Sequence, residues 1–289
     1  MFQDILITGL INGGVYALLA VGFSLIFGVA RIVNIAHTGF YMLSAYAIYA
    51  LIHTAKLHFA LAIPIAVAGV TLFSLLVYKL VIEPIREHES AVLIATIALA
   101  LVFQESLLLI FGGHFLGNPT LLDGKLELIG VTVTLQQALA LGVVTLVLAG
   151  TWLLLNHTRL GLAIRATAND AEVANLMGIN VRRVTMATLA ISVLLAAIAG
   201  AVVAPLFVLE PLMWLRPLVI ILSIVVLGGL GSIKGSVIGA FIIGYVETLT
   251  VFLIPSGSFL KGAVALGIMV IVLLFRPEGL FGVVFEEER

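Results

Sequence analysis

Polar and ionisable side chains interrupt the long apolar runs of this sequence at only a few positions. The candidates for chemistry within or beside those runs are Asn12, Asn34, His37, Gln104, Glu105 and Glu247. Ionisable groups at membrane depth are costly, so they are functional candidates by default. We interpret these residues as candidates for a polar pathway through a membrane.

Each of these candidates also has a structural interpretation. Gln104, Glu105 and Glu247 lie past the middle of their apolar segments, so they could face either a water-filled cavity or the outer headgroup region. For His37 we favour a hydrogen-bonded or interfacial role over a proton relay. For Asn12 we favour an interhelical hydrogen bond over a contact with a ligand.

Glycine accumulates around a segment, residues 216–231, that is short for a membrane crossing. The glycines in and after it are Gly228, Gly229, Gly231, Gly235, Gly239 and Gly244. Small residues let helix backbones approach closely in membranes, which explains most such glycines. Glycine-interrupted short segments are also where transport proteins break helices to line a polar path. We therefore keep Gly228 and Gly229 as pathway candidates and residues 31–38 as a second candidate break.

The polar stretch from 156 to 183 separates two strongly apolar segments and has helix signals of its own. Asn169 followed by Glu172 matches a capping box, and Gly178 can end the helix in a left-handed cap. Val173, Leu176 and Met177 recur at helical spacing between those two ends. The pattern predicts a short amphipathic helix at the cytoplasmic surface. It either rests on lipid headgroups or docks a cytoplasmic partner.

Several kinds of chemistry lack their sequence signals. No G-x-x-x-x-G-K-[ST] phosphate loop is present, so we expect ATP to be bound by a separate subunit and this chain to need no cofactor. The chain has no cysteine, and its net charge of -1 argues against a nucleic-acid partner. No pair of His, Asp or Glu at membrane depth has metal-ligand spacing, and no Gly-x-Ser-x-Gly elbow occurs. We expect neither a metal site nor enzyme activity.

Composition fixes the setting of these residues. Of the 289 residues, 62% are hydrophobic and 10% charged, with a mean hydropathy of +1.28, and the apolar runs approach the length that crosses a bilayer. We predict an all-α, polytopic bundle of about eight to ten membrane helices, some short or broken, forming one domain over 1–289. Its apolar segments are 5–27, 38–55, 57–79, 91–111, 131–155, 184–209, 216–231, 235–254 and 260–275.

Lysine and arginine set the orientation, because they are retained on the cytoplasmic side. With the N-terminus outside, most of the 14 basic residues fall inside, and only Lys56, Lys125, Arg216 and Lys261 fall outside. The first apolar run lacks a positive leader, so we expect a retained first helix in the inner membrane. The acidic tail 286–288 is then cytoplasmic.

Four ordered sequence blocks together resemble the permeases of branched-chain amino acid ABC importers, specifically the shorter of the two paired types. The blocks are 12–37, opening Asn-Gly-Gly-Val-Tyr-Ala-Leu and ending Asn-Ile-Ala-His; 161–179, opening Gly-Leu-Ala-Ile-Arg-Ala; 228–239, opening Gly-Gly-Leu-Gly-Ser; and 276–282, Arg-Pro-Glu-Gly-Leu-Phe-Gly. Two departures are Thr38-Gly39 after His37, where the family usually has glycine directly, and Ser44, where glycine is common.

The resemblance implies an importer built from two permeases, two cytoplasmic ATPases and an extracytoplasmic solute-binding protein, with an amino acid as substrate. The segment 156–183 would couple the permease to an ATPase, and its candidate contacts are Gly161, Arg165, Ala166, Asn169, Glu172, Val173, Ala174, Leu176 and Gly178. The sequence leaves open an ion-coupled secondary transporter of small amino acids or amides, an alternative motivated by Glu105, Glu247 and the two candidate helix breaks.

Overall fold

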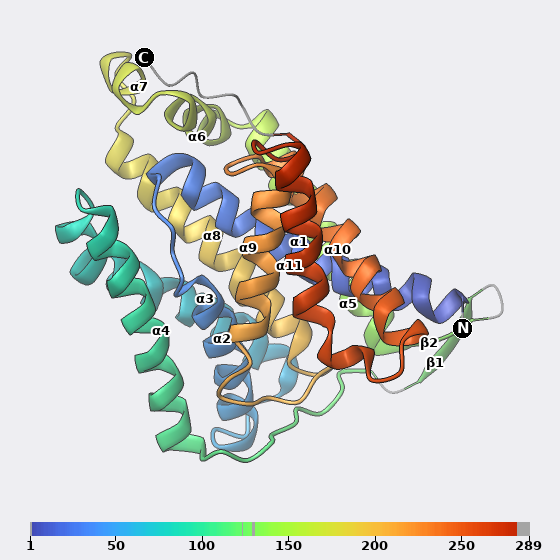
Figure 1. The fold of residues 1–289 in the computed structure, drawn as a ribbon. Helices are drawn as coiled ribbons and strands as arrows, with labels where there is room; N and C mark the ends of the chain where they lie inside the picture. The colour runs from blue at the N-terminus through green and yellow to red at the C-terminus, as the bar shows by residue number, and fades with distance from the viewer. Residues whose placement is uncertain (1, 123, 129–130, 282–289) are drawn as a thin grey trace.

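The computed structural model describes residues 2–122, 124–128 and 131–281 of the chain. This part is almost entirely helical, with one short hairpin and three short non-α turns (Figure 1). Gly282, the acidic tail and Arg289 lie outside the described residues. The elements are α1 (Phe2–Ala30), α2 (His37–His53), α3 (Phe59–Val77), η1 (Tyr78–Ile82), η2 (Glu83–Ile85), α4 (Glu89–Phe111), β1 (Lys125–Leu128), β2 (Val131–Thr134), α5 (Leu135–His157), α6 (Arg159–Asn169), α7 (Ala171–Leu176), α8 (Val181–Val203), α9 (Leu215–Gly228), α10 (Ile233–Leu253), η3 (Gly257–Phe259) and α11 (Lys261–Phe275).

The predicted polytopic helical bundle is confirmed. Each of the nine apolar segments overlaps one α-helix, and in the described residues six helices are long and apolar enough to cross a membrane. The α9 and α11 helices are shorter apolar helices. Large apolar side chains such as Leu72, Ile94 and Leu146 are 67–73% exposed, as expected for surfaces that face lipid.

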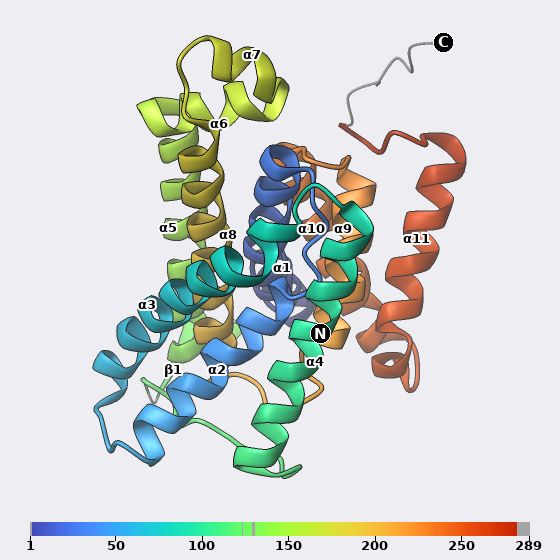
Figure 2. The same cartoon turned by 90° about the vertical axis from the view of Figure 1, so that its left-hand side faces the viewer.

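The α1 helix is the centre of the bundle. Most of its apolar span is buried, and it packs against α10, α8, α5 and α9 (Figures 1 and 2). It runs antiparallel to α10, with Gly244 against the backbone of Gly13 at one level and Gly231 against Gly28 at another. The absence of side chains at these positions lets the two backbones touch.

The predicted break at 31–38 is confirmed. The chain leaves helical geometry at Arg31, whose φ is 56°, and residues 31–34 belong to no helix. It then returns into the bundle, because Nε2 of His37, the first residue of α2, lies 3.1 Å from the carbonyl oxygen of Leu19. Leu19 is about 16 Å before the end of α1 at 1.5 Å per residue. Consequently α2 begins well inside the bundle.

Ser44, one of the departures from the family pattern, has a defined partner. Its hydroxyl donates a 2.8 Å hydrogen bond to the carbonyl oxygen of Ala197 on α8. Gly200, one turn along α8, lies directly against the carbonyl of Tyr41. The serine therefore adds a hydrogen bond at a close helix contact. The other departure, Thr38, is fully buried and its hydroxyl has no hydrogen-bond partner among the described atoms.

The expected helix start at residue 131 is wrong. Val131–Thr134 instead form β2, which pairs antiparallel with β1 so that Lys125 faces Thr134. The helix begins at Leu135, because Thr134 and Gln137 form a capping box: Thr134 Oγ1 accepts from the amide of Gln137 at 3.2 Å. Similarly, α8 ends at Val203 and not at 209, and a loop leads to α9.

The two ends of the bundle differ in charge, as the orientation rule requires. Arg31 follows α1, Lys234 lies in the first turn of α10 and Arg276 follows α11, all at the end that carries α6 and α7 (Figure 1). The four basic residues assigned to the outside lie at the other end of the bundle. Lys56 follows α2, Lys125 begins β1, Arg216 lies in the first turn of α9 and Lys261 begins α11. We therefore treat the α6–α7 end as cytoplasmic.

Candidate functional site

The connection from α5 to α6 is a tight elbow. Thr158 caps α6 by accepting a 3.0 Å hydrogen bond from the amide of Gly161. A Cβ on Gly161 would collide with the carbonyl oxygens of Leu154 and Leu155, so only glycine fits there. Arg31 at the end of α1 donates to the carbonyl oxygen of Ala168 at 3.1 Å. The α6 helix is thus joined to α5 and to the central helix.

The predicted capping box of the next helix is misplaced. Asn169 is the last residue of α6, and the residue with the extended backbone that an N-cap requires is Asp170. Its Oδ1 accepts from the amide of Val173 at 2.9 Å. The left-handed cap at Gly178 is confirmed, with φ +86° and a hydrogen bond from the amide of Ile179 to the carbonyl of Ala174.

The tip of this segment exposes apolar side chains. Val173 is 52% exposed, Leu176 85% and Met177 78%, whereas Ala174 is buried. These three side chains, the apolar tip, project from a short helix held at both of its ends. Glu172 is exposed beside them, and Ala166 and Arg165 lie on α6. This arrangement could bury its apolar tip in a protein groove or in a lipid surface.

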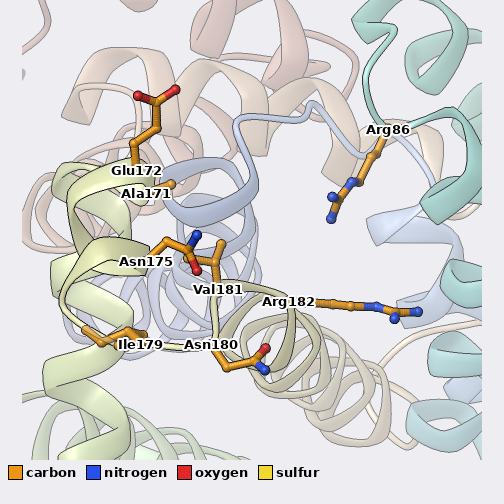
Figure 3. Close-up of a pocket in the computed structure, with 9 residues that line it drawn as sticks. Arg86, Ala171, Glu172, Asn175, Ile179, Asn180, Val181 and Arg182 are labelled. Carbon is orange, nitrogen blue, oxygen red and sulfur yellow. The ribbon is translucent and has the colours of Figure 1, made fainter.

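A groove of about 530 Å³ lies beside α7 (Figure 3). Glu172 and Asn175 line it from α7, and Arg86 faces it from the connection between α3 and α4. Arg182 at the start of α8 lines it too and pairs with Glu83, with 2.5 Å between Nε and Oε1. Arg86, Asn175 and Glu83 are not among the contacts predicted from the sequence; for Glu83 and Arg86 the available signal was the pair of opposite charges around Pro84.

Inside the bundle, polar side chains join α1 to α10. Tyr16 donates a 2.8 Å hydrogen bond to Oε2 of Glu247, which is fully buried, while Oε1 of Glu247 has no partner among the described atoms. Asn12 donates to Thr248 at 3.3 Å, which confirms the interhelical hydrogen bond expected of it. Two hydroxyl groups, Ser24 and Ser236, pair further along the same contact.

His37 is fully buried between α1 and α8, and its hydrogen bonding confirms the role favoured for it. Besides the contact with Leu19, its Nδ1 lies 3.4 Å from the hydroxyl of Ser192, which donates to the carbonyl of Gly22. Asn34 is also buried, and its carbonyl oxygen accepts from the amide of His37 at 3.2 Å.

Gln104 and Glu105 lie elsewhere, on the outer half of α4. Nε1 of Trp214 donates to Oε1 of Gln104 at 2.9 Å, and Nε2 of Gln104 donates to Glu105 at 3.1 Å. Gln104 is half-buried, whereas Glu105 is exposed on the flank of the bundle.

Gly228 and Gly229 end α9 at the cytoplasmic side. Gly228 lies against the backbone of Gly235, so the α9–α10 turn is closed by direct backbone contact. Gly229 has φ +98°, which favours glycine. The amides of Leu280 and Phe281 donate to the carbonyls of Leu227 and Gly228, so the last described residues pack against this turn through backbone hydrogen bonds.

The structure therefore does not gather the pathway candidates into one cluster. Asn12 and Glu247 lie along the α1–α10 contact, Asn34 and His37 at the start of α2, Gln104 and Glu105 on α4, and Gly228 and Gly229 at the cytoplasmic end. The coupling candidates, in contrast, all lie on α6, on α7 or, for Gly178, in the turn directly after α7. In the described part of the chain, no group of three or more His, Asp or Glu residues is placed to hold a metal ion.

A bundle of apolar helices long enough to cross a membrane, with a polar helical segment at one end, defines a multi-pass membrane protein. The chain belongs to the branched-chain amino acid transport system permease family, because the model of the family described as "Branched-chain amino acid transport system / permease component" matches residues 5–273. It is a multi-pass protein of the inner membrane.

Curated relatives agree over nearly the full length. The chain is 30% identical to the high-affinity branched-chain amino acid transport system permease protein BraD of Pseudomonas aeruginosa, over 96% of this chain and 94% of BraD. It is 27% identical to LivH of Escherichia coli K12, a permease protein of the same description, over 97% and 96% of the two chains.

The fold also matches a solved structure. PsaBC from Streptococcus pneumoniae, in complex with Fab, aligns with a TM-score of 0.57 and 14% identity, over 95% of this chain and 92% of that chain. This likeness concerns the fold alone.

Proposed function

We propose that the chain is the membrane-spanning permease subunit of an ATP-driven importer for branched-chain or related apolar amino acids. The relatives BraD and LivH are permease proteins of high-affinity branched-chain amino acid transport systems. ATP is bound by a separate subunit, since the chain has no phosphate-binding loop of its own. The complete importer contains a second permease, two cytoplasmic ATPases and an extracytoplasmic solute-binding protein.

The observation that carries this proposal is the apolar tip on α7. Leu176 and Met177 are the most exposed large apolar side chains of a segment that is tied to the end of α1 through Arg31 and to η2 through the Arg182–Glu83 pair. An ATPase that grips the tip would displace these helices as its nucleotide dimer closes. Transport then follows if the ATP-bound and ATP-free partners favour different permease conformations.

Replacement of Leu176 tests this role. Leu176→Asp places a charge where a protein partner would bury an apolar side chain, so we expect at least about a tenfold loss of ATP-dependent leucine uptake in reconstituted vesicles. Less ATPase should also copurify with the permease. Leu230→Asp, at another exposed apolar residue of the cytoplasmic end, is the matched control and should keep most of both activities.

The energy source is tested separately with an uncoupler of ion gradients. We expect uptake to continue at constant ATP when the proton and sodium gradients are collapsed. If uptake stops while ATP is maintained, the chain is an ion-coupled transporter and the proposal is wrong.

A further inference from the structure

A second groove runs along the membrane-facing side of the bundle, between α5 and α10 over the surface of α1. It encloses about 1180 Å³ and is lined on α5 from Leu141 to Asn156. At 1.5 Å per residue this lining is about 22 Å long, which is most of the hydrocarbon thickness of a bilayer. Figure 2 shows α5 on the opposite side of the bundle from α11.

The hydroxyl groups of the two threonines that line the groove are already hydrogen-bonded to the backbone of α5. The hydroxyl of Thr145 donates to the carbonyl of Leu141 at 2.8 Å, and that of Thr151 donates to Val147 at 2.8 Å. The remaining walls at this depth are aliphatic, aromatic or glycine, with Leu146 73% exposed, and the indole N–H of Trp152 is their one polar group among the described lining residues. A polar substrate would find few partners here, whereas a hydrocarbon chain fits the lining.

The cytoplasmic mouth of the groove has the opposite character. Arg165 of α6 and Lys234 of α10 line it, together with Asn156. Within the described residues neither cation forms an ion pair, and no acidic side chain lines the groove. The N-terminus of α10, capped by Ser232, opens at the same place and adds partial positive charge.

We propose that this groove is a binding site for an anionic phospholipid of the cytoplasmic leaflet. An acyl chain lies between α5 and α10, and the phosphate is bound at the mouth by Lys234 and Arg165. The charge pattern selects this occupant: a hydrocarbon slot that ends in two cations with no ion pair among the described residues is complementary to a molecule with an apolar tail and an anionic head. The proposal does not depend on the transported substrate.

Lipid retention by the full-length permease tests the headgroup contact. The chain is purified from phosphatidylcholine nanodiscs containing phosphatidylglycerol, and retained lipid is measured by native mass spectrometry. One basic residue near an anionic surface is worth about 1 kcal/mol, so Lys234→Gln should weaken phosphatidylglycerol retention about fivefold. Lys79→Gln, an exposed lysine of the same leaflet outside the groove, should not. Equal retention by both variants would overturn the proposal, as would protection from thermal unfolding by inorganic phosphate equal to that by phosphatidylglycerol.

Two glycines of α5 provide a matched test of the acyl slot. Gly142 lines the groove and Gly150 does not, and a Cβ at either position meets no atom within 4 Å. Gly142→Phe should fill the slot and abolish phosphatidylglycerol retention while the protein remains folded. Gly150→Phe should retain the lipid like the parent chain, and loss of lipid in both variants or in neither would contradict the proposal.

The absence of native cysteine allows the occupant to be identified directly. Leu146→Cys, coupled to a photoreactive probe, should cross-link to lipid in native membranes. A cross-link to a second polypeptide would show that the groove is a protein interface and would overturn the lipid assignment.

Discussion

Glu247 illustrates how an apolar membrane bundle accommodates a carboxyl group. It is fully buried where α10 packs on α1, and its one hydrogen-bond donor among the described atoms is the hydroxyl of Tyr16. No cation pairs with it in the described part of the chain. A buried charge without compensation is strongly destabilising, so the contact with Tyr16 matters more here than it would at a surface.

Tyr16→Phe should therefore lower the stability of the bundle. The substitution keeps the ring and leaves both carboxyl oxygens of Glu247 without a donor, at a cost of about 1–3 kcal/mol. Thermal unfolding of the purified chain in detergent measures this loss. Tyr245→Phe, which removes a 3.2 Å hydrogen bond to the carbonyl of Leu6 on the same pair of helices, is the matched control and should cost less than about 1 kcal/mol. Equal losses would show that Glu247 does not depend on Tyr16.

At the scale of single elements, the N-cap of α7 is Asp170, one residue after the Asn169 that the sequence pattern predicted. Asp170→Ala removes the side chain that caps the amide of Val173 and should destabilise the helix by about 1 kcal/mol. Hydrogen exchange of amides 171–177 should consequently become severalfold faster. Asn169→Ala should leave this exchange nearly unchanged, since Asn169 lies in the last turn of α6. Faster exchange in Asn169→Ala than in Asp170→Ala would show that Asn169, and not Asp170, caps the helix.

The membrane helices were predictable because runs of apolar residues must become helices when no water can satisfy their backbones. The start of α5 was less predictable, because the Val and Thr residues that precede it also suit a strand, and in β2 their pairing with β1 prevails. The break before α2 was visible because Asn34 and His37 interrupt an apolar run. Local signals such as Gly178 were informative for the same reason, since a left-handed backbone restricts the residue type.

Contacts between distant elements were outside the reach of the sequence. Tyr16 with Glu247 and Glu83 with Arg182 each join residues far apart in the chain, and nothing in their spacing indicates the pairing. Helices that are apolar on every side also give no sign of which face packs inward. For this reason the coupling segment, which is amphipathic and local, could be outlined, whereas the pathway candidates could only be named by residue type.

For the whole molecule, one feature controls the interpretation of both proposals: the side of the membrane on which α6 and α7 lie. The bundle places most of its basic residues at that end, and a charge bias of this kind sets the cytoplasmic side of a membrane protein. An ATPase can reach the apolar tip only from the cytosol, and the cations of the lipid groove fit the anionic surface of the cytoplasmic leaflet.

Single cysteines in this cysteine-free chain test that orientation. Met177 follows α7 directly and is 78% exposed, so Met177→Cys should react with a membrane-impermeant maleimide only in inside-out vesicles. Phe259→Cys in η3, 85% exposed at the opposite end, should react only in spheroplasts, where the outer face is accessible. The reverse pattern would place the apolar tip outside the cell. It would exclude docking of a cytoplasmic ATPase there and would put Lys234 in the outer leaflet. Both the ATPase-docking proposal and the cytoplasmic-leaflet lipid proposal would then be wrong.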